Sequence, residues 1–201
     1  MVGVENLVSR LGALLGLVTL GAIFAGIAQG LRRPKGRTLG VVETVPGGRF
    51  ALGVGVGYSL FSLLLWRPLP WRLSPNLRPA TALLGAALYV PGLALVLWSR
   101  WTLGKMYNVS SGFGVQLYAD HRLVTGGPYG LVRHPIYLGI LLAAVGGLLI
   151  YRTWAVLLMV VISAGLVLRA KNEERVLAAE FGEAWAAYCQ VVPAWMPHLP
   201  A

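Results

Sequence analysis

The sequence predicts an all-α integral membrane protein with about five transmembrane helices and a cytoplasmic C-terminal amphipathic helix. Three observations support this fold class. Hydrophobic residues make up 57% of the 201 residues, and charged residues make up only 12%. A soluble domain carries about 25% charged residues, roughly twice as many. The charges are also placed so that five apolar runs remain uninterrupted, as in helices that cross a bilayer.

The uncharged runs cover 12–31, 50–65, 80–98, 136–150 and 154–168. From them we predict transmembrane helices over roughly 12–31, 50–66, 80–101, 135–151 and 153–169. A spanning helix needs about 20 apolar residues, or somewhat fewer with anchored ends. The first and third runs meet this length, the second is slightly short, and the last two are shorter still. Only Tyr151-Arg152-Thr153 separates the last two, so we predict a tight helical hairpin there.

The N-terminal segment is expected to remain as the first membrane helix. Glu5 and Arg10 precede its apolar run, and neither a polar region nor a clear cleavage site follows, unlike in a signal peptide. The single cysteine, Cys189, excludes an internal disulfide and a multi-cysteine metal cluster. We therefore expect one membrane domain over 1–201, with the N-terminal spans in 1–99.

The net charge of +10 is distributed unevenly between the two sides of the predicted membrane domain. The segments 32–49, 99–135 and the tail from 169 contain twelve Lys or Arg, whereas the N-terminus, 66–79 and 151–153 contain five. The positive-inside rule then places the first group in the cytoplasm and the N-terminus outside. The membrane is the plasma or inner membrane if the source is prokaryotic. No domain-sized polar surface is left for nucleic acid, so that partner is not expected.

The tail after the fifth span is predicted to form an amphipathic helix on the cytoplasmic surface. Leu177, Phe181, Trp185 and Tyr188 recur at helical spacing, which favours one apolar face. Proline at 193 and 197 is expected to end the helix. Pairs of glycines four residues apart, at 12/16, 26/30 and 53/57, indicate close packing between membrane helices. They permit a dimer without requiring one, so we leave monomer and homodimer open.

The stretch "GGPYGLVRHPIY" joins a polar loop to the fourth apolar run. The residue before a proline is disfavoured in a helix and proline suits its first turn, so a helix should begin at Pro135, directly after His134. The free amides at this helix start and the charge of Arg133 then form a candidate site for a carboxylate or phosphate. Tyr129 and Tyr137 add aromatic faces and hydroxyls. An anchor at the membrane interface explains the same residue types equally well.

A second polar pair lies at the end of the fifth apolar run. Arg169 and Glu173 are four residues apart, so they project from one face if the helix continues beyond the membrane surface. Glu174 is the next residue. Such a pair can hold an anionic group through the arginine and position or deprotonate a nucleophile through the carboxylate. The alternative is an ordinary helix salt bridge of about 0.3–0.5 kcal/mol.

Together, "DHRLVTGGPYGLVRHPIYLG" and "KNEERVLAAEFGEAWAAYCQVVPAWMP" resemble the isoprenylcysteine carboxyl methyltransferase family, part of a wider membrane group that includes phospholipid N-methyltransferases. The resemblance covers roughly 100–197. It implies methyl transfer from S-adenosylmethionine at the cytoplasmic membrane face. The positions it implies for the cofactor are His121, Leu123, Val124, Gly127, Pro128, Tyr129, Arg133, His134, Pro135 and Tyr137. Those it implies near the acceptor, as catalytic residues, are Arg169 and Glu173 or Glu174.

One residue departs from the family pattern, because Trp185 stands where many relatives carry tyrosine. The acceptor is expected to be lipophilic: an isoprenylcysteine-type carboxylate, a lipid amine or a small hydrophobic thiol. His121, His134 and His198 lack metal-ligand spacing, so no metal site is predicted. Two other functions stay open, namely an NADPH-dependent membrane reductase of the sterol-reductase type and a non-catalytic membrane protein that binds lipid or a partner.

Overall fold

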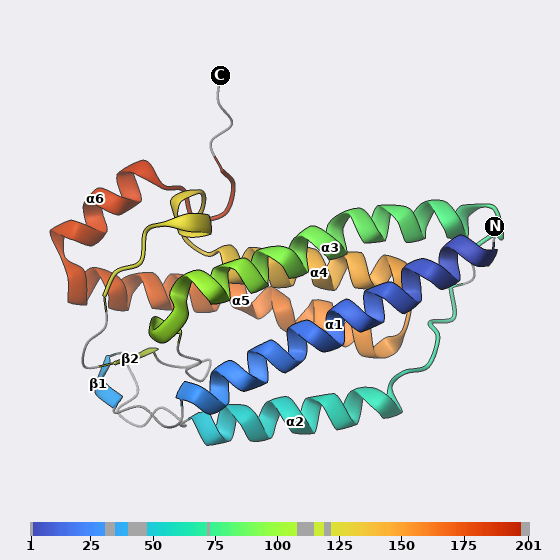
Figure 1. The fold of residues 1–201 in the computed structure, drawn as a ribbon, viewed down its shortest axis with the longest axis horizontal. Coiled ribbons are helices and arrows are strands. Elements are labelled where there is room, and N and C mark those ends of the chain that lie inside the picture. Colours follow the sequence, from blue (N-terminus) through green and yellow to red (C-terminus); the bar gives the residue numbers. More distant parts are fainter. Residues whose placement is uncertain are drawn as a thin grey trace.

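The computed structural model describes residues 2–30, 35–39, 48–71, 73–107, 115–118 and 122–197. Within these residues the chain forms a bundle of long helices with a smaller C-terminal helix at one end (Figure 1). The α-helices are α1 Val2–Gly30, α2 Gly48–Leu64, α3 Leu77–Leu103, α4 Pro135–Tyr151, α5 Trp154–Phe181 and α6 Glu183–Val191. The 3-10 helices are η1 Gly104–Met106 and η2 Gly127–Gly130.

The apolar helices differ in whether they are long enough to cross a bilayer. Three stretches, Gly3–Gln29, Leu77–Met106 and Trp154–Phe181, are long and apolar enough to cross a bilayer. The other two apolar helices are shorter, Leu52–Leu64 and Pro135–Tyr151. All five predicted helices exist, and the fourth has the predicted ends. The first begins ten residues earlier than predicted, and the fifth continues twelve residues further, to Phe181.

The predicted helical class is confirmed, but the structure adds two short strands that were not predicted. β1, Lys35–Leu39, pairs antiparallel with β2, Val115–Tyr118. Both strands lie near the end of the bundle that carries α6 (Figure 1). The prediction missed them because neither segment belongs to an apolar run, and a strand of four or five residues carries little periodicity of its own.

α3 and α4 make the closest helix pair in the bundle. A Cβ atom built on Gly92 of α3 would lie 2.7 Å from the Gly139 carbonyl oxygen, and one built on Gly146 of α4 would lie 2.5 Å from the Tyr89 amide nitrogen. Only glycine permits backbones this close, which is how helices associate in lipid. This contact holds the start of α4, and thus the predicted motif, in a fixed position beside α3.

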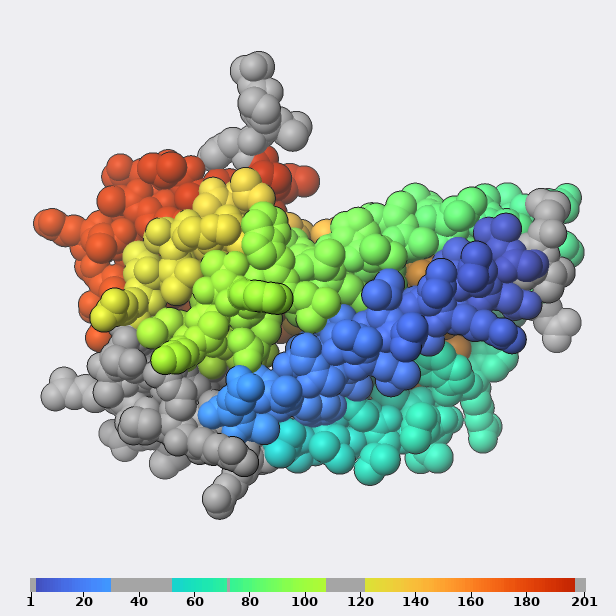
Figure 2. Space-filling view, in the orientation of Figure 1, coloured from blue at the N-terminus to red at the C-terminus, as the bar shows by residue number. Residues whose placement is uncertain are grey.

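At the end of the bundle far from α6, contacts join segments that are distant in the sequence. Arg152, in the α4–α5 turn, forms an ion pair with Glu5 of α1. The Tyr151 hydroxyl donates to the Ser9 carbonyl at 2.9 Å. The Leu69 amide donates to the Arg152 carbonyl at 2.8 Å, which ties the α2–α3 connection to the same turn. The N-terminus therefore lies at the end far from α6, and α1 crosses the front of the bundle (Figures 1 and 2).

The predicted single tail helix was wrong, because the chain bends at Gly182. This glycine has φ +51° and separates α5 from α6. The predicted apolar stripe still assembles across the bend, since Trp185 and Tyr188 of α6 pack with Leu177 and Phe181 of α5. α6 thus folds back toward the loop that precedes α4 rather than extending α5. As predicted, the helix ends before Pro193.

Candidate active site

A glycine and a proline pack the loop before α4 against α3. Gly127 has φ +60°, and a Cβ atom there would lie 2.9 Å from Thr102 Oγ1 at the end of α3. Pro128 is among the most deeply buried side chains of the described residues, and Tyr129 is 8% exposed. Gly127 and Pro128 therefore shape the loop against α3, and neither lines the cavity described below.

Arg133 joins three parts of the chain. Its Nε and Nη2 atoms donate to Glu174 Oε1 of α5 at 3.0 and 2.8 Å. Its Nη1 donates to the carbonyls of Val192 and Cys189 at 2.9 and 3.4 Å. The Arg133 amide also donates to the Pro193 carbonyl at 2.8 Å. Because a guanidinium has five N–H groups, about one remains for a ligand. The arginine thus ties the tail and α5 to the start of α4.

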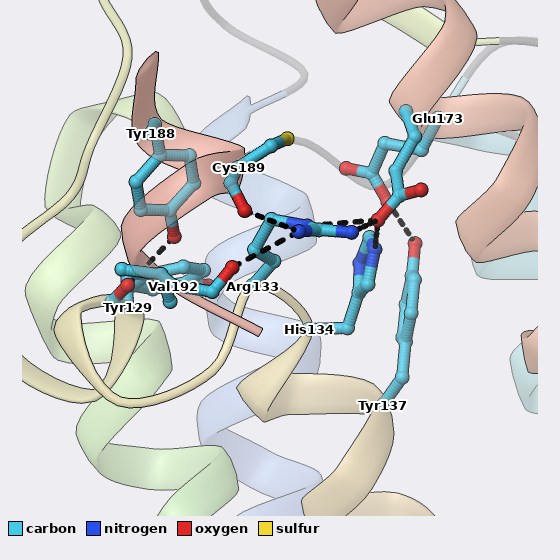
Figure 3. Close-up of polar contacts among 9 residues, drawn as sticks. Tyr129, Arg133, His134, Tyr137, Glu173, Tyr188, Cys189 and Val192 are labelled. Carbon is cyan, nitrogen blue, oxygen red and sulfur yellow. Dashed lines mark hydrogen bonds and ion pairs between the residues drawn. The ribbon is translucent and has the colours of Figure 1, made fainter. Parts of the chain in front are cut away.

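His134 precedes α4, as the sequence predicted, with α4 beginning at Pro135. The residue is 5% exposed, and its Nε2 atom lies 2.9 Å from Glu174 Oε1. The imidazole stacks on Tyr137 with the ring planes 9° apart (Figure 3). Glu174 therefore holds both residues of the Arg-His pair, and its carboxylate faces the loop.

Glu173, the neighbouring carboxylate, points to a different cluster. The Tyr137 hydroxyl donates to Glu173 Oε2 at 2.7 Å, and Arg169 Nε donates to the same hydroxyl at 2.8 Å. Because α5 continues beyond residue 169, Arg169 and Glu173 lie one turn apart, as predicted. The tyrosine of the fourth helix thus bridges a cation and a carboxylate of the fifth, a relation that spacing alone does not reveal.

A cavity of about 350 Å³ lies beside this cluster. Of the predicted residues, the cavity is lined by Leu123, Val124, Tyr129, Arg133, His134, Pro135, Tyr137, Arg169 and Glu173. Glu174 is not among its lining residues. His121 lies outside the described residues. The two motifs, far apart in sequence, therefore meet in one place.

The cavity wall changes character along the bundle. Toward the centre of the bundle it is formed by Ile23 of α1, Val96 of α3 and Leu166 of α5. Further along α3 and α5, toward the α6 end, Arg100 and Arg169 also line the cavity, whereas α1 contributes only apolar residues. The cavity thus combines a larger apolar wall with a smaller charged region, which suits an amphipathic ligand.

Two tyrosines form the wall nearest α6. The Tyr188 hydroxyl donates to the Tyr129 carbonyl at 2.6 Å, as Figure 3 shows. Burial raises the pKa of Tyr188 to about 12, against the opposing charge of Arg133. Burial, reinforced by Glu173, also raises the pKa of Tyr129. Both hydroxyls therefore keep their protons at neutral pH and act as hydrogen-bond donors.

Arg100 and Tyr107 line the cavity, but the sequence reading did not select them. The Arg100 guanidinium carbon lies 4.4 Å from the centre of the Tyr107 ring. Burial raises the pKa of Tyr107, and the charges of Arg100 and Arg169 oppose this shift. Tyr107 therefore lies within the influence of both arginines. The only available signal was an arginine near the end of an apolar run, and this is common at membrane interfaces.

Comparison with known families identifies a match for the second half of the chain. The family model described as "Phospholipid methyltransferase" matches residues 80–184, which is just over half of the 201 residues. The matched region contains most of α3, and all of α4 and α5 together with the η2 loop. It therefore includes both polar motifs of the site.

Two curated proteins are similar to part of the chain. One is the protein-S-isoprenylcysteine O-methyltransferase of Schizosaccharomyces pombe, 34% identical over 83 residues. The other is the cobalt-zinc-cadmium resistance protein CzcN of Cupriavidus metallidurans, 37% identical over 82 residues. Each alignment covers 40% of this chain, but only 35% and 38% of the respective relative. The chain thus matches little more than a third of either protein.

A solved structure has a similar fold. It is that of the eukaryotic intramembrane Ras methyltransferase, an isoprenylcysteine carboxyl methyltransferase. The match has a TM-score of 0.51 at 22% sequence identity, and covers 72% of this chain and 52% of the other. At this identity the comparison concerns the fold, which is that of an intramembrane helical protein.

Proposed function

We propose that this chain, which belongs to the phospholipid methyltransferase family, transfers a methyl group from S-adenosylmethionine to a lipophilic acceptor at the cytoplasmic membrane face. The resemblance to the isoprenylcysteine carboxyl methyltransferase family is confirmed by the family match, a curated relative and the fold. One observation carries the proposal. The Arg169–Tyr137–Glu173 cluster lies in a cavity whose other half is apolar.

The proposed topology has five spans. The chain is an integral membrane protein with three long apolar helices, and the 17-residue helices α2 and α4 are proposed to span as well. Twelve of the 17 basic residues fall in 32–49, 99–135 and the tail from 169, and the described parts of these segments lie at the end that carries the cavity (Figure 1). By the positive-inside rule we assign this end, including α6, to the cytoplasm and the N-terminus to the other side.

The cavity suits the proposed methyl donor in size and character. Its volume of about 350 Å³ lies within the range of about 300–1,000 Å³ typical of small-molecule sites. The rings of Tyr137 and Trp185, which line the cavity, offer stacking faces for an adenine. The remaining donor of Arg133 and the positive end of α4 suit a carboxylate. When bound, S-adenosylmethionine supplies an electrophilic methyl group.

The residues of the cluster are assigned roles by their contacts. Arg169 and Glu173 both hydrogen-bond the Tyr137 hydroxyl, so each has a fixed position before a ligand binds. For an amine or thiol acceptor, Glu173 takes the proton from the nucleophile. For a carboxylate acceptor, which is already ionised, Arg169 holds the oxygen atoms. The apolar wall keeps water from the nucleophile, which favours transfer.

Calorimetric titration of the detergent-purified protein tests this function against the two alternatives. The proposal expects heat of binding with S-adenosylmethionine and none with NADPH. Binding of NADPH alone would instead support a reductase, and binding of neither would support a non-catalytic membrane protein. Either of these results would overturn the proposed cofactor.

A further inference from the structure

The guanidinium of Arg100, on α3, lies between helix α1 and the ring of Tyr107. On one side its guanidinium lies over Tyr107, 4.4 Å from the ring centre. On the other side is Gly26 of α1, where a Cβ atom would lie only 2.5 Å from Arg100 Nε. The absence of a side chain at position 26 thus makes room for the guanidinium between α1 and α3. The arginine cannot be moved freely without losing one of these contacts.

The hydrogen-bonding capacity of Arg100 is poorly used. Its Nε atom is buried and has no hydrogen-bond partner among the residues that the structure describes. Its Nη1 and Nη2 atoms make only long contacts of 3.4 Å, to the Gly104 carbonyl and to Gln29 Oε1. Among the described residues, no carboxylate forms an ion pair with Arg100. A buried, unpaired donor is unfavourable, so this arrangement favours an anionic ligand.

Arg100 also lines the cavity in which the reacting cluster lies. Its neighbours in the wall are apolar residues of the same two helices, Ile27 of α1 and Val96 of α3. Tyr107 connects this position with Arg169, because the charges of both arginines act on its hydroxyl. A ligand with an anionic group at Arg100 can therefore place an apolar chain along α1 and α3 and a polar group near Arg169.

We propose that Arg100 is a specificity-determining residue that holds an anionic group, a carboxylate or a phosphate, of the lipophilic acceptor. The planar guanidinium matches either oxygen geometry, and Tyr107 and Gly26 fix the plane in which it presents its donors. This inference rests on the proposed function and narrows it to acceptors that carry a negatively charged group besides the polar group placed near Arg169. The carboxylate of the methyl donor is the other source of the same chemistry. We assign the acceptor because Arg100 adjoins the apolar wall, whereas the described residues that the resemblance implies for the cofactor lie on the loop and α4.

Equilibrium binding of simple amphiphiles to the full-length protein in neutral detergent tests the assignment. Radiolabelled laurate and dodecyl phosphate are compared with neutral dodecanol, which has the same chain length as both. The proposal expects the wild type to bind the two anions at least about ten-fold more tightly than the alcohol, as charge-assisted hydrogen bonds imply. Arg100→Gln should reduce this preference to less than about two-fold while retaining dodecanol binding, and Arg100→Lys should keep part of it.

A second pair of variants tests the position of the Arg100 guanidinium without removing the arginine. Gly26→Ala pushes the guanidinium from its position and should weaken the preference for anions. Gly21→Ala is the matched control on the same helix, because a Cβ atom there meets no atom within 4 Å. It should leave the preference unchanged. Gly26→Ala also tests the proposal if Arg100→Gln fails to fold.

Titration of the same variants with S-adenosylmethionine separates the two sources of the anion. The proposal expects Arg100→Gln to bind this cofactor as the wild type does. The assignment would be overturned if Arg100→Gln kept the wild-type preference for laurate over dodecanol. It would also be overturned if Arg100→Gln lost binding of S-adenosylmethionine while it kept that preference. If the wild type binds no cofactor but Arg100→Gln still loses the preference, the methyltransferase function fails and the anion site stands.

Discussion

Glu173 and Glu174 are adjacent in the sequence, but the fold gives them different partners. Successive residues of an α-helix project about 100° apart, so two neighbours cannot face the same ligand. Glu174 holds Arg133 and His134, whereas Glu173 receives the Tyr137 hydroxyl in the cavity. The sequence left open which carboxylate acts, because the choice depends on where the loop before α4 meets α5.

Replacing each glutamate by glutamine separates chemistry from anchoring. Glu173→Gln should reduce methyl transfer to an amine or thiol acceptor by at least about 100-fold, because it removes the proton acceptor. Glu174→Gln should instead lower the free energy of unfolding by about 1–3 kcal/mol, because charged hydrogen bonds to Arg133 and His134 are lost. Initial rates and thermal unfolding in detergent measure the two effects. The assignment fails if the two variants exchange these phenotypes.

The hydrogen-bond partners of Arg133 could not be predicted from the sequence. The pre-proline geometry correctly located His134 and the start of α4 at Pro135. The sequence could not show that the carbonyls of Cys189 and Val192 take up donors of Arg133, because the tail folds back only through the bend at Gly182. That Arg133 binds the carboxylate of S-adenosylmethionine therefore stays a proposal. Arg100 was missed because it belongs to no motif.

At the scale of elements, glycine positions determine how closely the helices approach. The sequence reading selected glycines four apart in the first two apolar runs. Of these, Gly12 and Gly16 accommodate Tyr151 and Tyr89, whereas a Cβ atom built on Gly53 or Gly57 would meet no atom within 4 Å. The closest approaches to a neighbouring backbone instead involve Gly85, Gly92, Gly139 and Gly146. Spacing identifies glycines on one helix face, but not which face meets a neighbouring helix.

Gly92→Ala tests the α3–α4 contact. The added methyl group would overlap backbone atoms of Gly139 and Ala143, which cannot move aside as a flexible side chain can. We expect the free energy of unfolding to fall by about 1–3 kcal/mol, as overpacking typically causes. Gly53→Ala on α2 is the control, because its site is open. Equal thermal stability of the two variants would show that the helices are not in close contact.

The molecule as a whole has a consistent polarity along its long axis. The turns that join α2 to α3 and α4 to α5 lie at the end with the N-terminus, and β1, β2, η2 and α6 lie at the other (Figure 1). Apolar runs were sufficient to predict the five apolar helices and this division, because lipid imposes length and hydrophobicity directly. The strands, the bend at Gly182 and the cavity depend on contacts between segments, so the sequence alone did not predict them.

Site-directed labelling tests the proposed orientation. In a Cys189→Ser background, single cysteines replace Ser74, in the α2–α3 connection, and Glu183, at the start of α6; both positions are exposed. A membrane-impermeant maleimide should label Ser74→Cys in intact bacterial cells. It should label Glu183→Cys only after permeabilisation. Labelling in the reverse order would contradict the assignment of the cavity to the cytoplasmic end.

The central claim is that the cavity transfers a methyl group to a lipophilic molecule. The most direct measurement incubates the purified, reconstituted protein with S-adenosylmethionine carrying a radiolabelled methyl group and a membrane lipid extract. The proposed function predicts label in the organic phase with wild-type protein and a large reduction with Glu173→Gln or Arg169→Gln. Wild-type protein that transfers no more label than heat-inactivated protein, or full transfer by both variants, would contradict it.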